Sequence, residues 1–345
     1  MSPSIWLEKG FGLAFPFIVA LVVAAVILLA IGENPIDIFS LMAKESFGSE
    51  RRIAATLSAA TPLLFTAVAT AICFRTGVFN VGVEGAFVVG GIAAAFIGFS
   101  LPAGMGFAII LFAFAFAALV GAIWLYIPGV LLAKLQVDEV VSTLMLNFVA
   151  FGVTGYLVNG PLLSEVSGNN VTPPVHEAAE LTRLMPPSTL HAGFIVGILV
   201  VIAYALWTRR TPSGFSAAMV GYSQRFSRAV GISVPASIIL VMVLSGVVAG
   251  FGGASHALGQ LHRFSDGFSP GYGFTGMAVA LLGRNSAIGI VLGAILFGAL
   301  ASAGTTIQLF SNIPLDLVNI IQGTVMIFAV VEIGRLRFLS RRPAP

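Results

Sequence analysis

The stretch FRTGVFNVGVEGAF, from Phe74 to Phe87, places polar and charged residues in a chain that is otherwise mostly aliphatic or aromatic. Asn80 and Glu84 are spaced i and i+4, so they would share one face of a helix that starts there. An ionisable group within an apolar span is costly, and Glu84 is therefore expected to face a cavity or a partner rather than lipid. We predict that both residues line a path for a polar solute.

A structural role is the alternative for the same stretch. Arg75 and Glu84 would then anchor the end of a helix, with Asn80 as its N-cap. Both alternatives place a break in the helical backbone here, because glycine permits conformations and close approaches that other residues cannot make. The glycines of the stretch are Gly77, Gly82 and Gly85.

Composition defines the class of protein. The 345 residues are 58% hydrophobic and only 9% charged, whereas soluble domains carry about 25% charged residues. The chain is therefore expected to be an integral membrane protein. A net charge of +3 on such a chain gives no basic surface for nucleic acid, so the cations are better understood as topology signals. Cys73 is the only cysteine, which excludes an internal disulfide and a metal site of paired thiolates.

Apolar runs of about twenty residues mark membrane crossings. They predict an all-α, polytopic membrane protein with about ten transmembrane or re-entrant helices in a single domain, 1–345. The eighth run is too short to cross and is expected to be re-entrant, since its flank SPGYGFTG supplies helix breakers. The expected segments are Phe11–Ile31, Ile53–Phe74, Val81–Phe99, Gly104–Leu132, Val140–Val158, Leu190–Trp207, Ala236–Leu258, Phe274–Leu282, Ala287–Ala303 and Leu315–Ile333.

The distribution of arginine predicts the orientation. Segment 208–234 holds four arginines and the tail after Glu332 holds four more, whereas loop 159–189 holds one arginine beside three glutamates. Cytoplasmic loops carry the excess of basic residues. The loop 159–189 is therefore expected outside, and the N-terminus, the C-terminus and segment 208–234 inside.

The outer loop divides the chain into halves 1–158 and 190–345, each with about five segments. An odd number of crossings in each half predicts an inverted 5+5 repeat. In such folds the interrupted helices of the two halves meet near the bilayer midplane and line the substrate path. The candidate pair is RTGVFNVGVEG and FSPGYGFTGMAVALLG.

Catalytic and metal chemistry have little support in the sequence. His256 and His262 are six residues apart and no H-E-x-x-H motif occurs, so no metal site is expected. Ser255 and His256 are adjacent, which does not give a nucleophile and base facing one another. No G-x-x-x-x-G-K-[ST] loop occurs, so the chain cannot itself hydrolyse ATP. We predict a protein that is not an enzyme.

Four segments together resemble a known family. They are RTGVFNVGVEG, DEVVSTLMLNF at Asp138–Phe148, GFSAAMVGYSQRFSRAVGIS at Gly214–Ser233 and ALLGRNSAIGIVLGAILFGAL at Ala280–Leu300. The chain is similar to the permease subunits of bacterial ABC importers for nucleosides, which are related to the simple-sugar permeases. The resemblance implies a subunit of the bacterial cytoplasmic (inner) membrane, embedded in membrane lipid. It also implies a second homologous permease subunit, a cytoplasmic ATP-binding subunit and an external substrate-binding lipoprotein as partners, with ATP held by the partner and no cofactor in this chain.

The resemblance assigns a role to the basic segment 208–234. Similar loops carry the coupling helix that docks into the ATPase. The match departs from the family where its usual Asn is Gln224 and where a common Ala-Ala pair is Arg228–Ala229. The alternative is a solvated loop whose arginines only set topology. The residues expected to couple are Gly221, Gln224, Arg225, Arg228, Ala229 and Gly231.

The path is expected to supply hydrogen bonds for a base and a ribose and an aromatic face for stacking. A buried amide such as Asn147 more often bonds across helices than binds ligand. Simple sugars remain an alternative substrate, and a gradient-driven transporter or channel for a small polar solute is an alternative function. Glu84 is the only strong intramembrane carboxylate, which favours the permease. The expected path residues are Phe79, Asn80, Glu84, Asn147, Tyr272 and Phe274.

Overall fold

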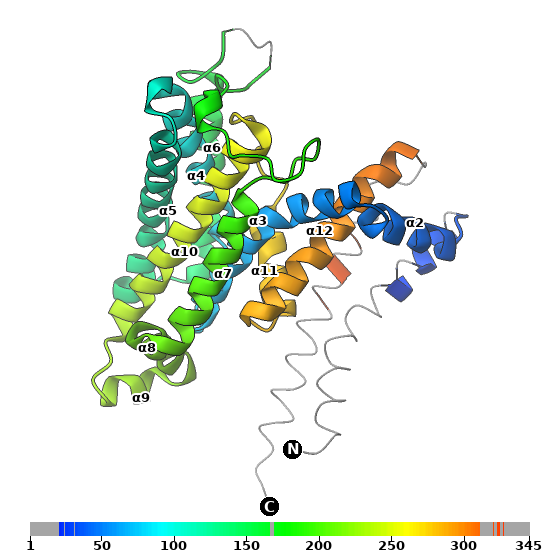
Figure 1. Ribbon diagram of the computed structural model, residues 1–345. Helices are drawn as coiled ribbons and strands as arrows, with labels where there is room; N and C mark the ends of the chain where they lie inside the picture. The colour runs from blue at the N-terminus through cyan, green and yellow to red at the C-terminus, as the bar shows by residue number, and fades with distance from the viewer. Residues whose placement is uncertain are drawn as a thin grey trace, which may run out of the picture.

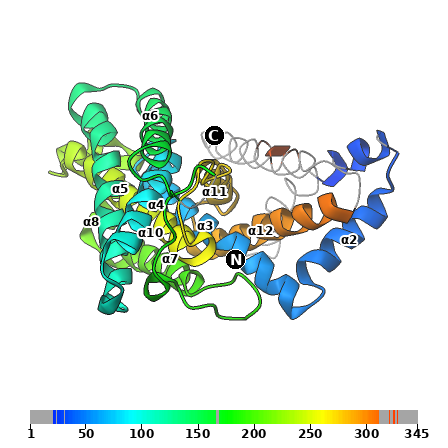
Figure 2. The same cartoon turned by 90° about the horizontal axis from the view of Figure 1, so that it is seen from above.

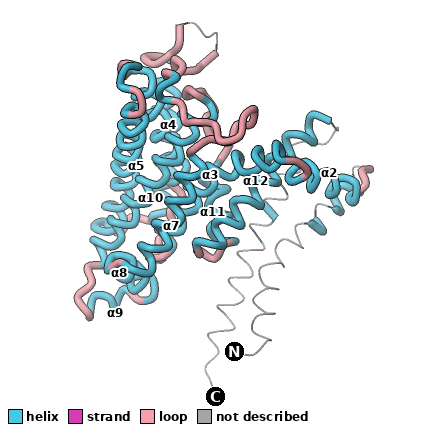
Figure 3. The backbone as a smooth tube through the Cα atoms, in the orientation of Figure 1, coloured by secondary structure: helices cyan, strands magenta, loops and turns pink. Residues whose placement is uncertain are grey.

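The computed structural model describes residues 21–23, 25–30, 32–165, 169–310, 320, 323, 324 and 327. In this part of the chain the regular elements are helices, as Figure 3 shows, with two isolated β-bridges between loops. The all-α prediction is confirmed. Seven of the described helices are long and apolar enough to cross a membrane. They are α3 (Glu50–Phe74), α4 (Val83–Ser100), α5 (Ala108–Leu135), α6 (Glu139–Asn159), α7 (Gly193–Arg210), α10 (Val234–His256) and α12 (Ala287–Phe310).

Three predicted segments are not among these seven helices. The eighth forms α11 (Tyr272–Leu282), an 11-residue helix that is too short to cross, as its length predicted. The first predicted segment, Phe11–Ile31, and the last, Leu315–Ile333, fall largely outside the described residues. The count of about ten helices and the inverted repeat therefore stay predictions.

One helix was not predicted. Helix α2 (Pro35–Phe47) lies between the first two predicted segments, in a stretch for which no helix was predicted. Asn34 caps it by accepting a hydrogen bond from the backbone N–H of Ile36, and Pro35 occupies its first turn. These are ordinary signals for a helix start, but hydropathy analysis passes over them because the segment is amphipathic rather than apolar.

The helices form an inner pair and an outer set. In α3 and α4 the most apolar stretch is 83% and 78% buried, whereas in α5, α6 and α7 it is 28%, 28% and 22% buried. The outer helices thus present apolar side chains outward, as lipid contact requires. Figure 2 shows α2 and α12 on one side of α3, with α5 and α6 on the other.

Close packing of α10 against α5 forms much of the remaining core. Gly246 and Gly250 are spaced i and i+4, and a Cβ at either position would clash with a backbone carbonyl of α5. Small residues at this spacing let two helix backbones approach closely within a membrane.

The two long loops lie at opposite ends of the bundle, as Figure 1 shows. One end carries the loop 160–192, whose described residues pack on the segment after α10, where the backbone N–H of Thr172 donates to the carbonyl of Phe264 at 2.9 Å. The other end carries α8 (Pro212–Tyr222) and α9 (Gln224–Ala229). This arrangement agrees with the predicted outer and cytoplasmic loops, although their sides of the membrane stay a prediction.

Candidate functional site

The backbone between α3 and α4 is not helical. Helix α3 ends at Phe74 and α4 begins at Val83, so residues 75–82, here called the break, leave the helical path. Gly77 adopts φ +76°, a left-handed conformation that glycine accommodates without strain. Buried backbone groups that leave a helix must find other partners. The question is which residues supply them.

The side chain of Asn80 provides one of these hydrogen-bond partners. It is fully buried, its Oδ1 accepts a hydrogen bond from Gly82 N–H at 2.8 Å, and its Nδ2 donates to Ser245 Oγ at 3.1 Å. Asn80 thereby shapes the turn into α4 and ties it to α10. The N-cap position itself is Gly82, with no side-chain cap, so the alternative that named Asn80 as the N-cap is wrong in its detail. Whether Asn80 also meets a solute stays a prediction.

Helix α6 braces the break from the other side. The Oδ1 of Asn147 accepts from Gly85 N–H at 2.9 Å, and its Nδ2 donates to the carbonyl of Val81 at 3.0 Å. The hydroxyl of Thr143 accepts from Val81 N–H at 3.2 Å. Asn147 therefore makes the cross-helix bonds that a buried amide was expected to prefer.

Glu84 joins the two glycine-rich segments that the sequence paired. Its side chain is buried in the first turn of α4, and its carboxylate accepts a hydrogen bond from the backbone N–H of Gly273, the second residue of α11. Ser269, which precedes α11, also interacts with this carboxylate. A carboxylate at the N-terminal ends of two helices is stabilised by both helix dipoles. Arg75 does not pair with Glu84 but donates to the carbonyl of Thr208 at 3.5 Å.

The predicted aromatic residues fall into separate groups. Phe79 is about two-fifths exposed and stacks on Phe74, with ring centroids 5.3 Å apart. Tyr272 packs edge-on against Phe87 at 5.7 Å and against His256 at 5.1 Å. Phe274 is 40% exposed. The structure thus brings Tyr272 close to Glu84 along α11 but places Phe79 in another aromatic group.

The predicted coupling residues share one property, which is exposure at the end of the molecule that carries α8 and α9. Ser223 separates the two helices and caps α9 through its hydroxyl. Within α9 the side chain of Ser227 turns inward and is buried. The exposed residues are Gly221, Gln224, Arg225, Arg228, Ala229 and Gly231.

Helix α8 touches the break directly. Gly221 lies so close to the carbonyl of Arg75 that any Cβ at this position would overlap it, and Gly77 lies against the same glycine. A predicted coupling residue is therefore in direct contact with the break, which also contains the predicted path residues Phe79 and Asn80. A displacement of α8 would therefore change a contact with the break.

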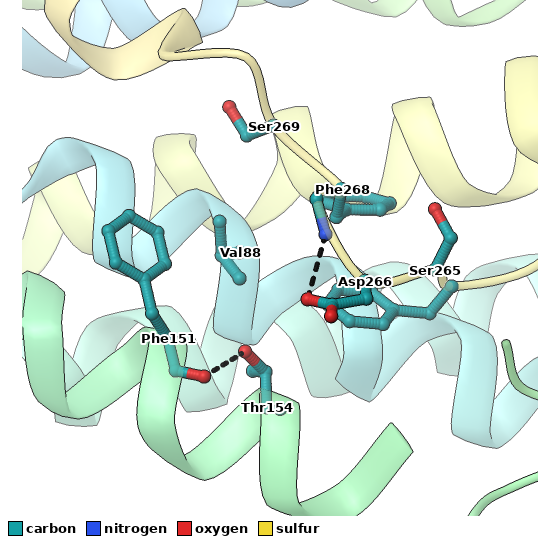
Figure 4. Close-up of a pocket in the computed structure, with 10 residues that line it drawn as sticks. Val88, Phe151, Thr154, Ser265, Asp266, Phe268 and Ser269 are labelled. Carbon is teal, nitrogen blue, oxygen red and sulfur yellow. Dashed lines mark hydrogen bonds between the residues drawn. The ribbon is translucent and has the colours of Figure 1, made fainter. Parts of the chain in front are cut away.

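A small pocket of about 170 Å³ lies between α4, α6 and the loop 264–269, as Figure 4 shows. The hydroxyl of Thr154 donates to the carbonyl of Ala150 at 2.8 Å, and the carboxylate of Asp266 accepts from Gly267 N–H at 3.0 Å. These two side chains are thus engaged within their own elements. None of the predicted path residues is among its described lining residues.

Comparison with known proteins gives consistent matches. Residues 52–330 match the model of the family described as "Branched-chain amino acid transport system / permease component". The guanosine ABC transporter permease protein NupP of Bacillus subtilis is 33% identical, over 93% of each chain. The glucose ABC transporter permease protein TsgB13 of Haloferax volcanii is 32% identical, over 95% of this chain and 88% of its own.

A third relative, the nucleoside ABC transporter permease protein NupB of Lactococcus lactis, is 32% identical over 89% of this chain and 87% of its own. No solved structure matches significantly. The family match covers most of the chain, including the break, α6, α8, α9 and α11. The chain therefore belongs to this family of ABC transporter permeases, which are membrane transport proteins.

Proposed function

We propose that the chain is the translocation subunit of an ATP-driven importer of nucleosides in the bacterial inner membrane, with both termini cytoplasmic. A second homologous permease, a cytoplasmic ATP-binding subunit and an external substrate-binding lipoprotein complete the transporter. Relatives named for guanosine and for nucleosides support this substrate class. A relative named for glucose keeps simple sugars as the second candidate substrate.

The main support for this proposal is the contact between Gly221 of α8 and the carbonyl of Arg75 in the break. ATP hydrolysis in a separate subunit can drive a conformational change in a permease only if the permease has a cytoplasmic surface to which that subunit binds. Helices α8 and α9 offer an exposed basic surface at one end of the bundle, and the inner side of α8 rests on the break between α3 and α4. Docking there would act on the break without an intermediate element.

The bond between Glu84 and Gly273 extends this connection to the second half of the chain. We infer that α4 and α11 are the interrupted helices of an inverted repeat, since each begins after a glycine-rich break and their N-terminal ends meet. Motion at the break would then move α11. Phe79, Asn80, Asn147, Tyr272 and Phe274 are proposed as path residues together with Glu84.

A gradient-driven transporter is the second candidate, with Glu84 as the residue that binds a proton or a sodium ion. The hydrogen bond from Gly273 N–H, which holds the Glu84 side chain between the N-terminal ends of α4 and α11, favours a fixed structural role instead.

One substitution tests the coupling surface. Gly221→Glu should abolish nucleoside-stimulated ATP hydrolysis in the complete complex, because α8 could no longer lie on the carbonyl of Arg75. Gly104→Glu is the matched control, since a side chain at Gly104 meets open space at the opposite end of the bundle. Equal stimulation of ATP hydrolysis in the two variants, with equal protein in the membrane, would contradict the proposal.

A further inference from the structure

A cavity of about 490 Å³ lies between α3, α11 and α12. Small-molecule sites in proteins range from about 300 to 1,000 Å³. The three helices contact one another, and Thr189 of the loop 160–192 and Gln260 after α10 complete the wall. The cavity therefore lies toward the end of the bundle that is expected to face outward. Its described lining residues are Ala55, Ser58, Ala59, Leu63, Thr189, Gln260, Pro270, Tyr272, Thr275, Phe297, Ala301, Ser302 and Thr305.

The chemistry of this wall suits a neutral polar molecule. Five of the described lining residues carry hydroxyls on aliphatic side chains, one carries an amide and Tyr272 carries a phenol. None of the described lining residues is charged, so a phosphate group would lose water without gaining a cation. Arg51 and Arg52 line an adjoining surface pocket, which shares Ala55 with the cavity among the described residues, and Arg52 is paired with Glu45. Hydrogen-bonding groups beside an aromatic ring are what a nucleoside requires.

An irregular turn brings Gln260 to the cavity. Helix α10 ends at His256 and continues as one π-helical turn, Ala257–Leu261. Such turns occur mostly as single bulges and frequently at functional sites. The buried His256 interacts with the Gln260 side chain and is itself held between the rings of Phe268 and Tyr272, at 5.0 and 5.1 Å. The π-helical turn thus places Gln260 between this buried histidine and the cavity.

The cavity is connected to the break through α11. Tyr272 and Thr275 line the cavity, and Gly273 between them bonds to Glu84. Helix α11 also packs tightly on α3, because a Cβ at Gly276 would overlap the side chain of Thr66. One wall of the cavity is therefore hydrogen-bonded to the first turn of α4, which directly follows the break.

We propose that this cavity is a binding site for an unphosphorylated nucleoside, and that Gln260 is a recognition residue within it. The Gln260 amide and the Thr275 hydroxyl bind polar groups of the base or ribose, and Tyr272 packs against the base. This inference rests on the proposed import of nucleosides and adds the location of the site and the discrimination against phosphate.

Cysteine protection tests the location. Thr275→Cys in the complete transporter should react with a thiol reagent added from outside, the reaction should block uptake, and adenosine or guanosine should slow it. Adenosine monophosphate and glucose should not. The native Cys73 is fully buried, which keeps the background low. Ser265→Cys, at a half-buried position in the small pocket of Figure 4, is the matched control, and nucleosides should not protect it.

Gln260→Ala tests recognition. Loss of one hydrogen bond should raise the nucleoside concentration for half-maximal uptake about tenfold, with maximal uptake per inserted molecule unchanged. Ser302→Cys, at a half-buried lining position, repeats the protection assay if Thr275→Cys fails to insert. Absence of protection at both positions, in a transporter that still imports nucleosides, would overturn this site and leave the importer standing. Absence of nucleoside uptake by the unmodified complex would overturn the importer itself.

Discussion

The carboxylate of Glu84 is hydrogen-bonded to the backbone N–H of Gly273, 189 positions further along the chain. The bond joins the first turn of α4 to the first turn of α11, and a Cβ at Gly273 would clash with the Glu84 backbone. This approach is possible only because residue 273 has no side chain. Two short glycine-rich stretches from the two halves of the chain thereby become one structural unit.

Two substitutions of Glu84 should show how much its charge and its hydrogen-bond acceptor each contribute to stability. Glu84→Gln keeps an acceptor for Gly273 but removes the negative charge at two helix ends, which should cost about 1–2 kcal/mol. Glu84→Leu removes the acceptor as well and should cost more. Thermal unfolding in detergent would measure both, with the exposed Glu177→Gln as control. Equal stability of all three variants would contradict a structural role for the Glu84 carboxylate.

Asn80→Leu should destabilise the protein because it leaves Gly82 N–H and the Ser245 hydroxyl without their partner. Unpaired buried groups of this kind cost about 1–3 kcal/mol. We expect a lower melting temperature and less protein in the membrane, whereas the exposed Asn159→Leu should change neither. Uptake per inserted molecule tests separately whether Asn80 lines the path, as the sequence predicted. A lower uptake per molecule, in addition to a lower amount of inserted protein, would support that role. An unchanged melting temperature would show that Asn80 does not hold the break.

Several of these features follow from sequence patterns. The break, the short α11 and the exposed basic loop were predicted, because glycines, apolar run lengths and arginines are local signals. The bond between Glu84 and Gly273 was anticipated only as a meeting of two interrupted helices, since no local pattern specifies which backbone N–H a carboxylate will find. Helix α2 was missed because an amphipathic segment between apolar spans resembles a loop in hydropathy.

The cavity and Gln260 had no signal in the sequence. A π-helical turn has no residue pattern of its own here, and Gln260 stands in a run, ALGQLHRF, that reads as the end of an apolar helix. Its role depends on how α3, α11 and α12 pack, which is a property of distant contacts. Tyr272 was chosen for its aromatic ring, and it is the one predicted path residue among the described cavity lining.

Acid should weaken the outer loop through His191. Burial, together with the nearby His262, lowers the pKa of His191 to about 4, from 6.5. The unfolded chain binds a proton there more readily, so the stability contribution is complete above pH 6.5 and declines as the pH falls from 6.5 toward 4. Thermal unfolding at pH 7.5 and pH 5 should show a smaller acid-induced decrease in His191→Gln than in the wild type. His176→Gln is the control and should show the same acid-induced decrease in melting temperature as the wild type. If the decrease in His176→Gln were as small as in His191→Gln, the effect could not be assigned to His191.

The orientation can be tested with single cysteines. Thr182→Cys lies exposed in the loop 160–192 and should react with an impermeant maleimide in intact cells. Gln224→Cys lies exposed at the start of α9 and should react only after permeabilisation. The wild type, whose Cys73 is buried, should not react. The reverse pattern would place the basic helices outside and remove the proposed ATPase surface.

Nucleoside uptake by the purified complete complex in liposomes would show whether this chain belongs to an ATP-driven importer. We expect uptake that requires the separate ATP-binding subunit and hydrolysable ATP, and that persists when ionophores collapse the ion gradients. Uptake by this chain alone, driven by a proton or sodium gradient and independent of ATP, would contradict it.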